Sequence, residues 1–245
     1  YEDAEPDEMN FTSNLDVGSM RAALAMATKN KWSLGALDVS TAFLNAHMPL
    51  GHKQVIMKPP AVMVRFGLVE ANELWVAQRA IYGLRCSPRA WGEHRDKELK
   101  SLVIQMDGVD HVLVQSHADP AVWSIRIKGD PEDKVLGYLL SYVDDFLCMV
   151  DAKLVAAVQS SLGRLWKVST QPMVGPQNPG TLKYLSIVIG VRADGTITLS
   201  QREYIEEMLA KWGMAECNGT HSINVEHEPY MFFGADFDEA EDEER

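Results

Sequence analysis

The adjacent acids Asp144 and Asp145 are the clearest candidates for chemistry in this sequence. They interrupt the run GYLLSYVDDFLCMV, residues 137–150, which is otherwise rich in apolar residues. Two apolar strands joined by two turn-forming acids predict a tight β-hairpin, and an exposed turn is the ordinary role of such a pair. The functional alternative is that the acids bind cations, because adjacent like charges repel unless a cation lies between them. Clustered carboxylates hold two divalent metals in phosphoryl transfer, and Mg²⁺ prefers oxygen ligands.

Such a site needs a third acid from another part of the chain, and Asp38 is the candidate. It stands in GALDVSTAFLNA, near the end of a short apolar strand predicted around 36–39. The alternative interpretation makes Asp38 the N-cap of a helix over VSTAFLNA, in which case Phe43 is only a core residue.

Four helices and several strands must position these acids. The helices are predicted after Asp16, from Ser87-Pro88 to about residue 103, over about 153–166, and from a capping box at Ser200 and Glu203 to about residue 212. Strands are predicted over residues 53–60, 73–79, 121–128, 134–143 and 146–150, and a second hairpin, KYLSIVIGV with TITLS, around Asp194-Gly195. This order predicts an α+β fold with an antiparallel sheet.

Charge is distributed unevenly along the 245 residues. The net charge of −12 divides into −5 for residues 1–10, −8 for residues 226–245 and +1 for the residues between them. Acidic ends of this kind are typical of solvated, disordered tails. The nearly neutral middle neither excludes nor indicates a polyanionic partner.

Three widely spaced cysteines without a C-x-x-C pair indicate a reduced, intracellular protein with no disulfide framework. No apolar run approaches the roughly 18 residues that a membrane span needs, so no membrane partner is expected.

Five blocks of the sequence, in order and spacing, resemble the reverse transcriptases of copia-type LTR retrotransposons, which are part of the Pol polyprotein. The blocks are LDVSTAFLNA, AIYGLRCSPRAW, SHADPAVW, YLLSYVDDFL and TITLSQREYIEEMLAKWGM. The resemblance covers about residues 26–214. It implies a right-hand polymerase with a ferredoxin-like palm, an antiparallel sheet, partial fingers and the start of a thumb.

The resemblance implies that Asp38, Asp144 and Asp145 are both the catalytic residues and the metal ligands. Two Mg²⁺ ions would be held there, with Mn²⁺ as a possible substitute. In the family, Asp38 and Asp144 would bridge the two metals, and Asp145 would lie closer to the primer end. The reaction would add dNTPs to a primer 3′-hydroxyl.

The same resemblance assigns substrate contacts. Phe43 would lie under the sugar and exclude a 2′-hydroxyl. Tyr82, Gly83, Arg85 and Arg89 would lie beside the template base and incoming nucleotide, with the two guanidinium groups as phosphate partners. The alternative for both arginines is that they are ordinary solvated cations at a helix end. Tyr142 and Val143 would contact the primer–template by packing.

The expected domain boundaries follow from these motifs. We expect an acidic tail over 1–15, the start of the palm with partial fingers over 16–47, and a fingers segment over 48–85. The palm with the catalytic hairpin would occupy 86–195, the start of the thumb or connection 196–225, and a second acidic tail 226–245.

Some positions depart from the family pattern. Ser186 stands where the family usually has glycine, in a hairpin thought to support the primer, and the basic strand segment expected upstream of Asp38 is replaced by acidic sequence. The chain is therefore expected to be an RNA-directed DNA polymerase fragment, or a decayed copy that acts only as a nucleic-acid-binding or protein-binding scaffold. Expected partners are an RNA or DNA template with its primer, dNTPs, and the integrase and ribonuclease H modules of the polyprotein. A cytoplasmic particle or the nucleus is the expected location.

Overall fold

The computed structural model of the chain describes residues 14–48 and 54–217. The acidic tails expected over 1–15 and 226–245 lie outside the described residues, apart from Asn14 and Leu15. The chain divides into two compact units, Tyr1–Gln201 and Arg202–Arg245. In the second unit, α6 spans Arg202–Lys211, in agreement with the helix expected there.

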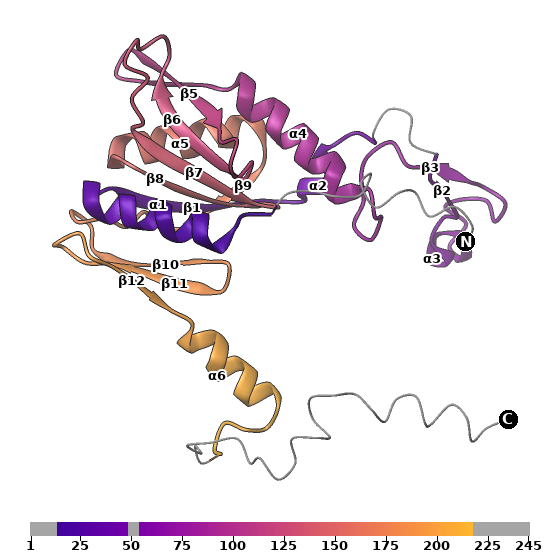
Figure 1. The fold of residues 1–245 in the computed structure, drawn as a ribbon. Coiled ribbons are helices and arrows are strands. Elements are labelled where there is room, and N and C mark those ends of the chain that lie inside the picture. The colour runs from indigo at the N-terminus through magenta and orange to yellow at the C-terminus, as the bar shows by residue number, and fades with distance from the viewer. Residues whose placement is uncertain (1–13, 49–53, 218–245) are drawn as a thin grey trace, which may run out of the picture. The chain divides into compact units, whose positions relative to one another are not determined.

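A seven-stranded sheet forms the centre of the first unit (Figure 1). Its strand order is β4-β5-β6-β7-β8-β1-β9, and every neighbouring pair is antiparallel. The strands are β1 (Ser33–Val39), β4 (Val103–Met106), β5 (Val109–Gln115), β6 (Val122–Ile127), β7 (Gly137–Tyr142), β8 (Asp145–Val150) and β9 (Val168–Thr170). The predicted α+β class with an antiparallel sheet is confirmed.

Both faces of this sheet are covered. Two helices, α4 (Ser87–Ser101) and α5 (Ala152–Leu165), pack on one face. The other face packs against α1 (Val17–Asn30) and a three-stranded sheet of β10 (Gly180–Tyr184), β11 (Ile187–Val191) and β12 (Ile197–Ser200). We call these the α4/α5 face and the α1 face.

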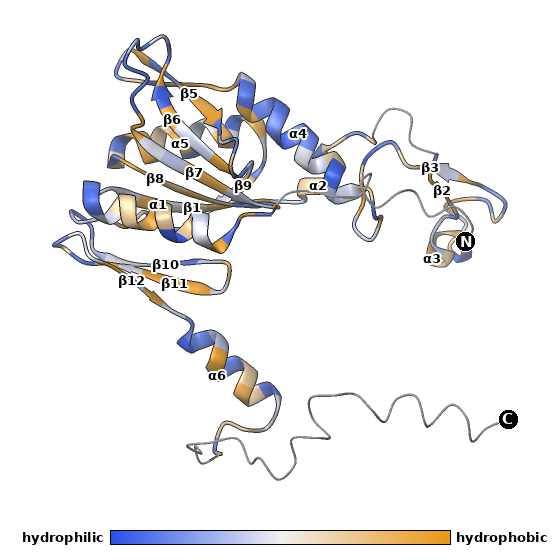
Figure 2. Ribbon diagram, in the orientation of Figure 1, coloured by the Kyte–Doolittle hydropathy of each residue, from blue (hydrophilic) through white to orange (hydrophobic). Residues whose placement is uncertain are grey.

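Burial on both faces explains the apolar sequence of β8. Phe146, Cys148 and Val150 belong to the core on the α4/α5 face. Leu147 and Met149, which alternate with them, belong to the core on the α1 face. A strand covered on both sides is apolar at nearly every position. In Figure 2 β8 is accordingly orange, whereas α4, which exposes one side to solvent, is largely blue.

Helix α1 begins as predicted. The Asp16 carboxylate accepts a hydrogen bond from the Ser19 N–H at 2.9 Å, which satisfies one of the free amides of the first turn. The Asp16 N–H donates to the buried carboxylate of Asp119 at 3.0 Å, so the cap is also tied to the loop before β6. Met20, Leu24 and Ala27 face the core, in agreement with the predicted apolar face.

Several short elements differ from the prediction. The expected strands over 53–60 and 73–79 reduce to β2 (Ile56–Met57) and β3 (Trp75–Val76), with residue 53 outside the described residues. The two short helices α2 (Ala42–Asn45) and α3 (Ala61–Arg65) were not predicted. The strands β4, β5, β9 and β10 were not predicted either. Such short elements carry too few residues for a hydrophobic period to appear.

The segment KYLSIVIGV is not one strand. It breaks at Leu185-Ser186 into the end of β10 and the whole of β11, whose hairpin pairs Tyr184 with Ile187. Both turn residues have positive φ, 50° and 62°, which is the sign pattern of a type I′ hairpin turn. The hairpin expected around Asp194-Gly195 is confirmed by the pairing of β11 with β12. Among the described residues, no helix is long and apolar enough to cross a membrane.

Candidate active site

Asp38 and Asp145 lie directly opposite each other on neighbouring central strands. They are cross-strand partners in the pairing of β1 with β8. Ala36 and Leu147, two positions away on each strand, pack on the α1 face, so strand alternation directs both carboxyl groups to that face. Two like charges directly opposite each other destabilise a sheet, so a purely structural role does not explain this pair of aspartates. The helix-cap alternative for Asp38 is wrong, because Asp38 is inside β1 and the N-cap position of α2 is Thr41.

The turn between β7 and β8 is one residue earlier than predicted. Its two central residues are Val143 and Asp144, while Asp145 is the first residue of β8 and pairs with Tyr142. The two acids are therefore not equivalent, since Asp144 occupies the turn and Asp145 the strand end beside Asp38. We call residues 142–145 the acidic turn.

Val143 adopts an uncommon backbone conformation in the acidic turn. Its φ is +52°, and Asp144 is not among the residues with positive φ, which is the sign pattern of a type II′ turn. Glycine usually occupies that position, and a β-branched residue there is a genuine outlier. Such strain persists only where the surroundings determine the conformation.

Two hydrogen bonds hold the carbonyl groups of the acidic turn. The indole Nε1–H of Trp91, on α4, donates to the Val143 carbonyl at 2.7 Å. The Val39 N–H, at the end of β1, donates to the Asp144 carbonyl at 2.9 Å. The turn is thereby tied to α4 and to the strand that carries Asp38.

Ionisation of both carboxyl groups, those of Asp144 and Asp145, is electrostatically unfavourable. Burial, together with the charges of Asp144 and Asp38, raises the pKa of Asp145 from 3.8 to about 6. Burial chiefly, and then the charge of Asp38, also raises the pKa of Asp144, while a backbone hydrogen bond opposes the rise. A bound cation would remove this repulsion.

The chemistry of this donor set fits Mg²⁺. All three side chains are carboxylates, two of them are direct cross-strand neighbours, and hard divalent cations prefer oxygen. Within residues 14–48 and 54–217, however, no group of three or more His, Cys, Asp or Glu side chains is already gathered closely enough to hold a metal by itself. Polymerase-type sites complete the coordination with waters and substrate phosphates, so a partly assembled set is compatible with this use.

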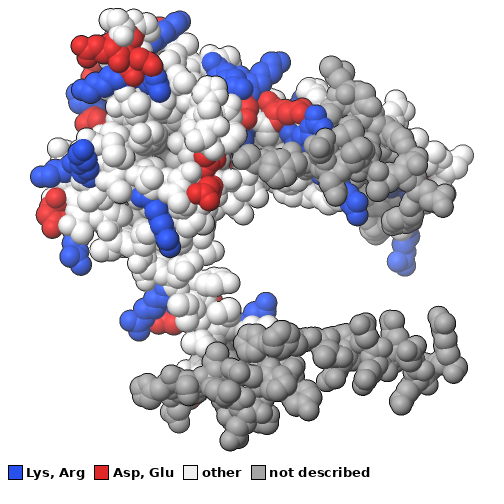
Figure 3. Space-filling model, in the orientation of Figure 1, with Lys and Arg blue, Asp and Glu red and all other residues white. Residues whose placement is uncertain are grey.

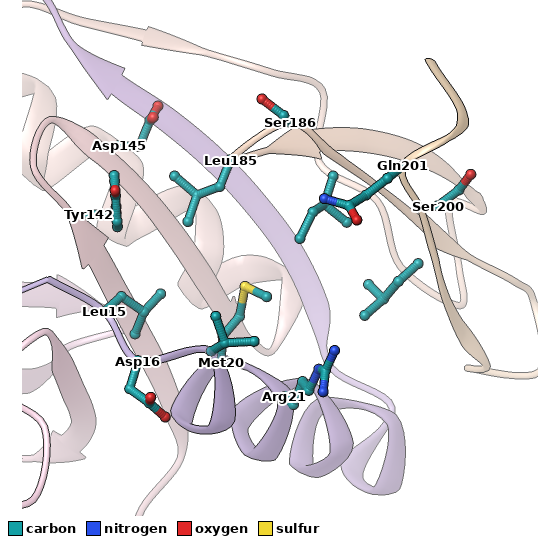
Figure 4. Close-up of a pocket in the computed structure, with 13 residues that line it drawn as sticks. Leu15, Asp16, Met20, Arg21, Tyr142, Asp145, Leu185, Ser186, Ser200 and Gln201 are labelled. Atoms are coloured by element: carbon teal, nitrogen blue, oxygen red, sulfur yellow. The ribbon is translucent and has the colours of Figure 1, made fainter. Parts of the chain in front are cut away.

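A pocket of about 740 Å³ opens beside Asp145 on the α1 face. Figure 4 shows Asp145 and Tyr142 at one end, α1 with Asp16 and Arg21 along one side, and the hairpin with Ser186 on the other side. The wall mixes apolar and polar side chains: Leu15, Asp16, Val17, Met20, Arg21, Tyr142, Asp145, Leu185, Ser186, Ile187, Leu199, Ser200 and Gln201. Of the two residues predicted to contact primer–template, Tyr142 lines this pocket, whereas Val143 packs toward the α4/α5 face.

Phe43 and Tyr82 are brought together, although they are 39 positions apart in the sequence. Their ring centroids are 4.6 Å apart at an interplanar angle of 48°. Phe43 is half-buried and packs against the core of the α4/α5 face, and Tyr82 is 57% exposed. Phe43 is thus neither a fully buried core residue nor a free surface ring.

The other predicted substrate residues lie in the segment before α4 and in its first turn. Gly83 has φ +93° and nothing within 4 Å of the position a Cβ would take, so the backbone there is open to an approaching ligand. Arg85 is exposed. The Arg89 Nε–H donates to the Glu93 carboxylate at 2.7 Å, an i,i+4 ion pair, so a phosphate there would compete with Glu93.

Sequence reasoning gave no role to Trp91, whose side chain donates a hydrogen bond to the acidic turn from outside the hairpin. The residue stands in the block AIYGLRCSPRAW, but its type alone indicates only a core side chain. The hydrogen bond joins residues 52 positions apart, and the local sequence patterns that predict helices and strands do not indicate a contact over that distance. On the face drawn in Figure 3, the described Lys and Arg side chains are interspersed with acids and do not form one basic stripe.

Comparison with known proteins gives a consistent result. Residues 7–226 match the family model described as reverse transcriptase (RNA-dependent DNA polymerase). The Pol polyprotein from transposon TNT 1-94 of Nicotiana tabacum is 25% identical over 206 residues, which is 83% of this chain and 14% of the relative.

Two further relatives agree with this match. The Pol polyprotein from transposon RE1 of Arabidopsis thaliana is 26% identical over 205 residues, covering 83% of this chain and 12% of the relative. The putative transposon Ty5-1 protein of Saccharomyces cerevisiae is 27% identical over 173 residues, which cover 69% of this chain and 47% of the relative. The chain therefore spans from about an eighth to about half of the length of these relatives.

Proposed function

Because the chain belongs to the copia-type reverse transcriptase family, we propose that it is an RNA-directed DNA polymerase that transfers nucleotides from dNTPs to a primer 3′-hydroxyl. The observation that carries this proposal is the direct cross-strand pairing of Asp38 with Asp145, next to Asp144 in a constrained turn. This arrangement concentrates three carboxyl groups at the end of a rigid sheet, at the cost of electrostatic repulsion. Nucleotidyl transfer with divalent metals uses such a cluster.

The three carboxylates would hold two Mg²⁺ ions, for which Mn²⁺ could substitute. The chemistry supplied by the bound ions would be a lower pKa of the primer hydroxyl and neutralisation of charge on the triphosphate and the leaving pyrophosphate. Asp38 and Asp145 supply oxygen ligands from two adjacent strands, which limits their relative motion. Asp144 supplies a ligand from the turn, where its backbone carbonyl is fixed by the Val39 N–H.

Nucleotide recognition would use the segment before α4. Gly83 leaves room for close backbone approach, and the adjacent Tyr82 ring contacts Phe43. A sugar lying on Phe43 would have no space for a 2′-hydroxyl, so the ring pair would favour deoxynucleotides. Arg85 and Arg89 would contact phosphates, Arg89 after release from Glu93.

We also propose an assignment of the elements to a polymerase architecture. The seven-stranded sheet with α4 and α5 would be the palm, and the segment containing β2, β3 and α3 would belong to the fingers. The second unit, with α6, would begin the thumb or connection. Template, primer and dNTPs are the proposed partners. The relatives are named as Pol polyproteins, which makes other Pol modules, such as integrase and ribonuclease H, the proposed neighbours.

Primer extension tests the proposal. The assay uses an RNA template, an annealed DNA primer, dNTPs and Mg²⁺, and compares the unmodified chain with Asp38→Asn and Asp144→Asn. The matched control is Asp194→Asn, which removes a carboxylate from a distant turn and creates Asn-Gly, a favoured hairpin turn.

Extension by the unmodified chain and by the Asp194 variant, lost in both of the other variants, would support the proposal. Folded protein that binds primer–template without extending it would refute the polymerase assignment and favour the scaffold alternative. Extension that persists in Asp38→Asn would contradict the metal-binding role of that residue.

A further inference from the structure

We propose that Trp91 is a positioning residue for the reaction: its indole N–H holds the acidic turn, which carries Asp144 and Asp145, against the end of β1, which carries Asp38. This inference rests on the proposed function. Trp91 would touch neither substrate nor metal, and would act only through the backbone carbonyl of Val143.

The contact is specific, and its donor side chain is buried. Trp91 is 1% exposed, and its Nε1–H donates to the Val143 carbonyl at 2.7 Å. An indole has one donor and no acceptor, so its orientation is determined by this bond. A partly buried carbonyl that loses its donor is left without a protein partner at some cost in free energy, and the acidic turn would have to shift to find another partner.

The acidic turn needs such support because it is strained. Val143 has φ +52°, in a region that β-branched residues rarely adopt. Without an external constraint, the residue would relax toward negative φ and move the Asp144 side chain. The Trp91 indole N–H binds the carbonyl of Val143, and the Val39 N–H binds the carbonyl of Asp144. The carbonyl groups of both central residues of the turn are therefore held by hydrogen bonds.

The Trp91 ring is itself fixed by aromatic neighbours. It packs edge-on against Trp166, with ring centroids 5.2 Å apart, and Trp166 stacks on Phe146 at 6.1 Å. The Trp166 indole N–H points elsewhere, to the His94 ring at 3.4 Å. The two tryptophans thus share one cluster, but Trp91 alone of these two donates to the acidic turn.

Helix α4 also connects the acidic turn to the proposed nucleotide site. Arg89 is two residues before Trp91, and the buried Ser87 hydroxyl donates to the Ile81 carbonyl at 2.6 Å, just before Tyr82. The α4 N-terminus is therefore tied to the loop that would contact the nucleotide and, through Trp91, to the acidic turn. We infer that this single side chain keeps the metal-binding acids in register with the nucleotide.

The test compares Trp91→Phe, which keeps an aromatic ring and removes the donor, with Trp166→Phe, which removes a donor from the same cluster without a bond to the turn. We expect kcat of primer extension to fall by about tenfold or more in Trp91→Phe, since small misplacements at a reacting centre are costly. The dNTP KM should change by less than about twofold, because ground-state binding is untouched. For Trp166→Phe, kcat should stay within about threefold of the value for the unmodified chain, when the two proteins are folded to the same extent. This is the effect expected for the loss of one interaction away from the reacting centre.

A second readout does not depend on activity. The Val39 amide bonds to the Asp144 carbonyl, so its hydrogen-exchange rate, followed by NMR, reports on the acidic turn. We expect about fivefold to tenfold faster exchange in Trp91→Phe, the size expected for loss of one hydrogen bond, and little change in Trp166→Phe. If Trp91→Phe fails to fold, β-(3-benzothienyl)alanine at position 91 replaces the N–H by sulfur and retains the two-ring shape.

Equal kcat and equal exchange in the Trp91 variant and the unmodified chain would overturn the inference, as would equal losses in the two tryptophan variants. If the unmodified chain extends no primer but Val39 exchange still rises only in the Trp91 variant, the proposed function fails while the positioning of the turn by Trp91 is supported.

Discussion

Replacing Asp145 by asparagine is expected to stabilise the folded protein above pH 6 while abolishing the proposed activity. The side chain is half-buried opposite Asp38, and burial with the two neighbouring charges raises its pKa from 3.8 to about 6. In the window between these values, the folded protein binds more protons than the unfolded chain, so stability falls as pH rises. Above pH 6 the ionised carboxylate imposes its full penalty, which the uncharged amide avoids.

The magnitude follows from the pKa. A change from 3.8 to about 6 corresponds to about 3 kcal/mol between the two protonation states. Solvent screening of a half-exposed group reduces this, so we expect the variant to gain about 1 to 2 kcal/mol at pH 7.5. The gain should shrink toward zero near pH 4.

Urea unfolding followed by tryptophan fluorescence at several pH values between 4.5 and 8 measures this difference. Asp194→Asn is the control, because hydrogen bonds from Thr196 lower the pKa of Asp194 and removal of its charge should give no stabilisation. An Asp145 variant that is less stable than the unmodified chain at pH 7.5, or a gain that does not vary with pH, would refute the electrostatic reasoning.

Three further perturbations have expected outcomes. Ser186→Gly should raise the free energy of unfolding by about 0.5 to 1 kcal/mol in urea, since φ +62° strains serine but not glycine; a loss of stability would contradict the assigned turn. Asp16→Ala should cost about 1 kcal/mol through loss of the α1 cap, while Asp16→Asn should cost less, and equal thermal stability of both variants would argue against a capping role. Phe43→Ala should raise ribonucleotide incorporation relative to dNTP by about tenfold or more in primer extension, with exposed Leu44→Ala as control; unchanged selectivity would remove Phe43 from the sugar contact.

The sequence predicted elements where local signals are strong. The α1 cap at Asp16, the Ser87-Pro88 start of α4 and the Asp194-Gly195 hairpin each depend on residues within a few positions of one another. The two acidic-turn strands were anticipated as well, because their apolar runs are long. Short elements such as α2 and β9 were missed, since tertiary contacts rather than local propensity maintain them.

Turn positions were less predictable than strands. Aspartate is common in turns, so Asp144 and Asp145 were both assigned as the central turn residues, whereas Val143 occupies the first central position with a positive φ. The same difficulty arose at Leu185-Ser186, where neither residue signals a turn. In both places the packing of the two strands overrides the preference of the residue for negative φ.

The sequence by itself determined the kind of protein: the five ordered blocks identified the family, and the residue types singled out Asp38, Asp144 and Asp145. Only the tertiary structure decided that Asp38 faces Asp145 across a strand pair and that Trp91 holds the turn between β7 and β8. The reason is physical. Residue types and periods are local properties of the chain, whereas cross-strand register and the partner of a buried indole are set by how distant elements pack.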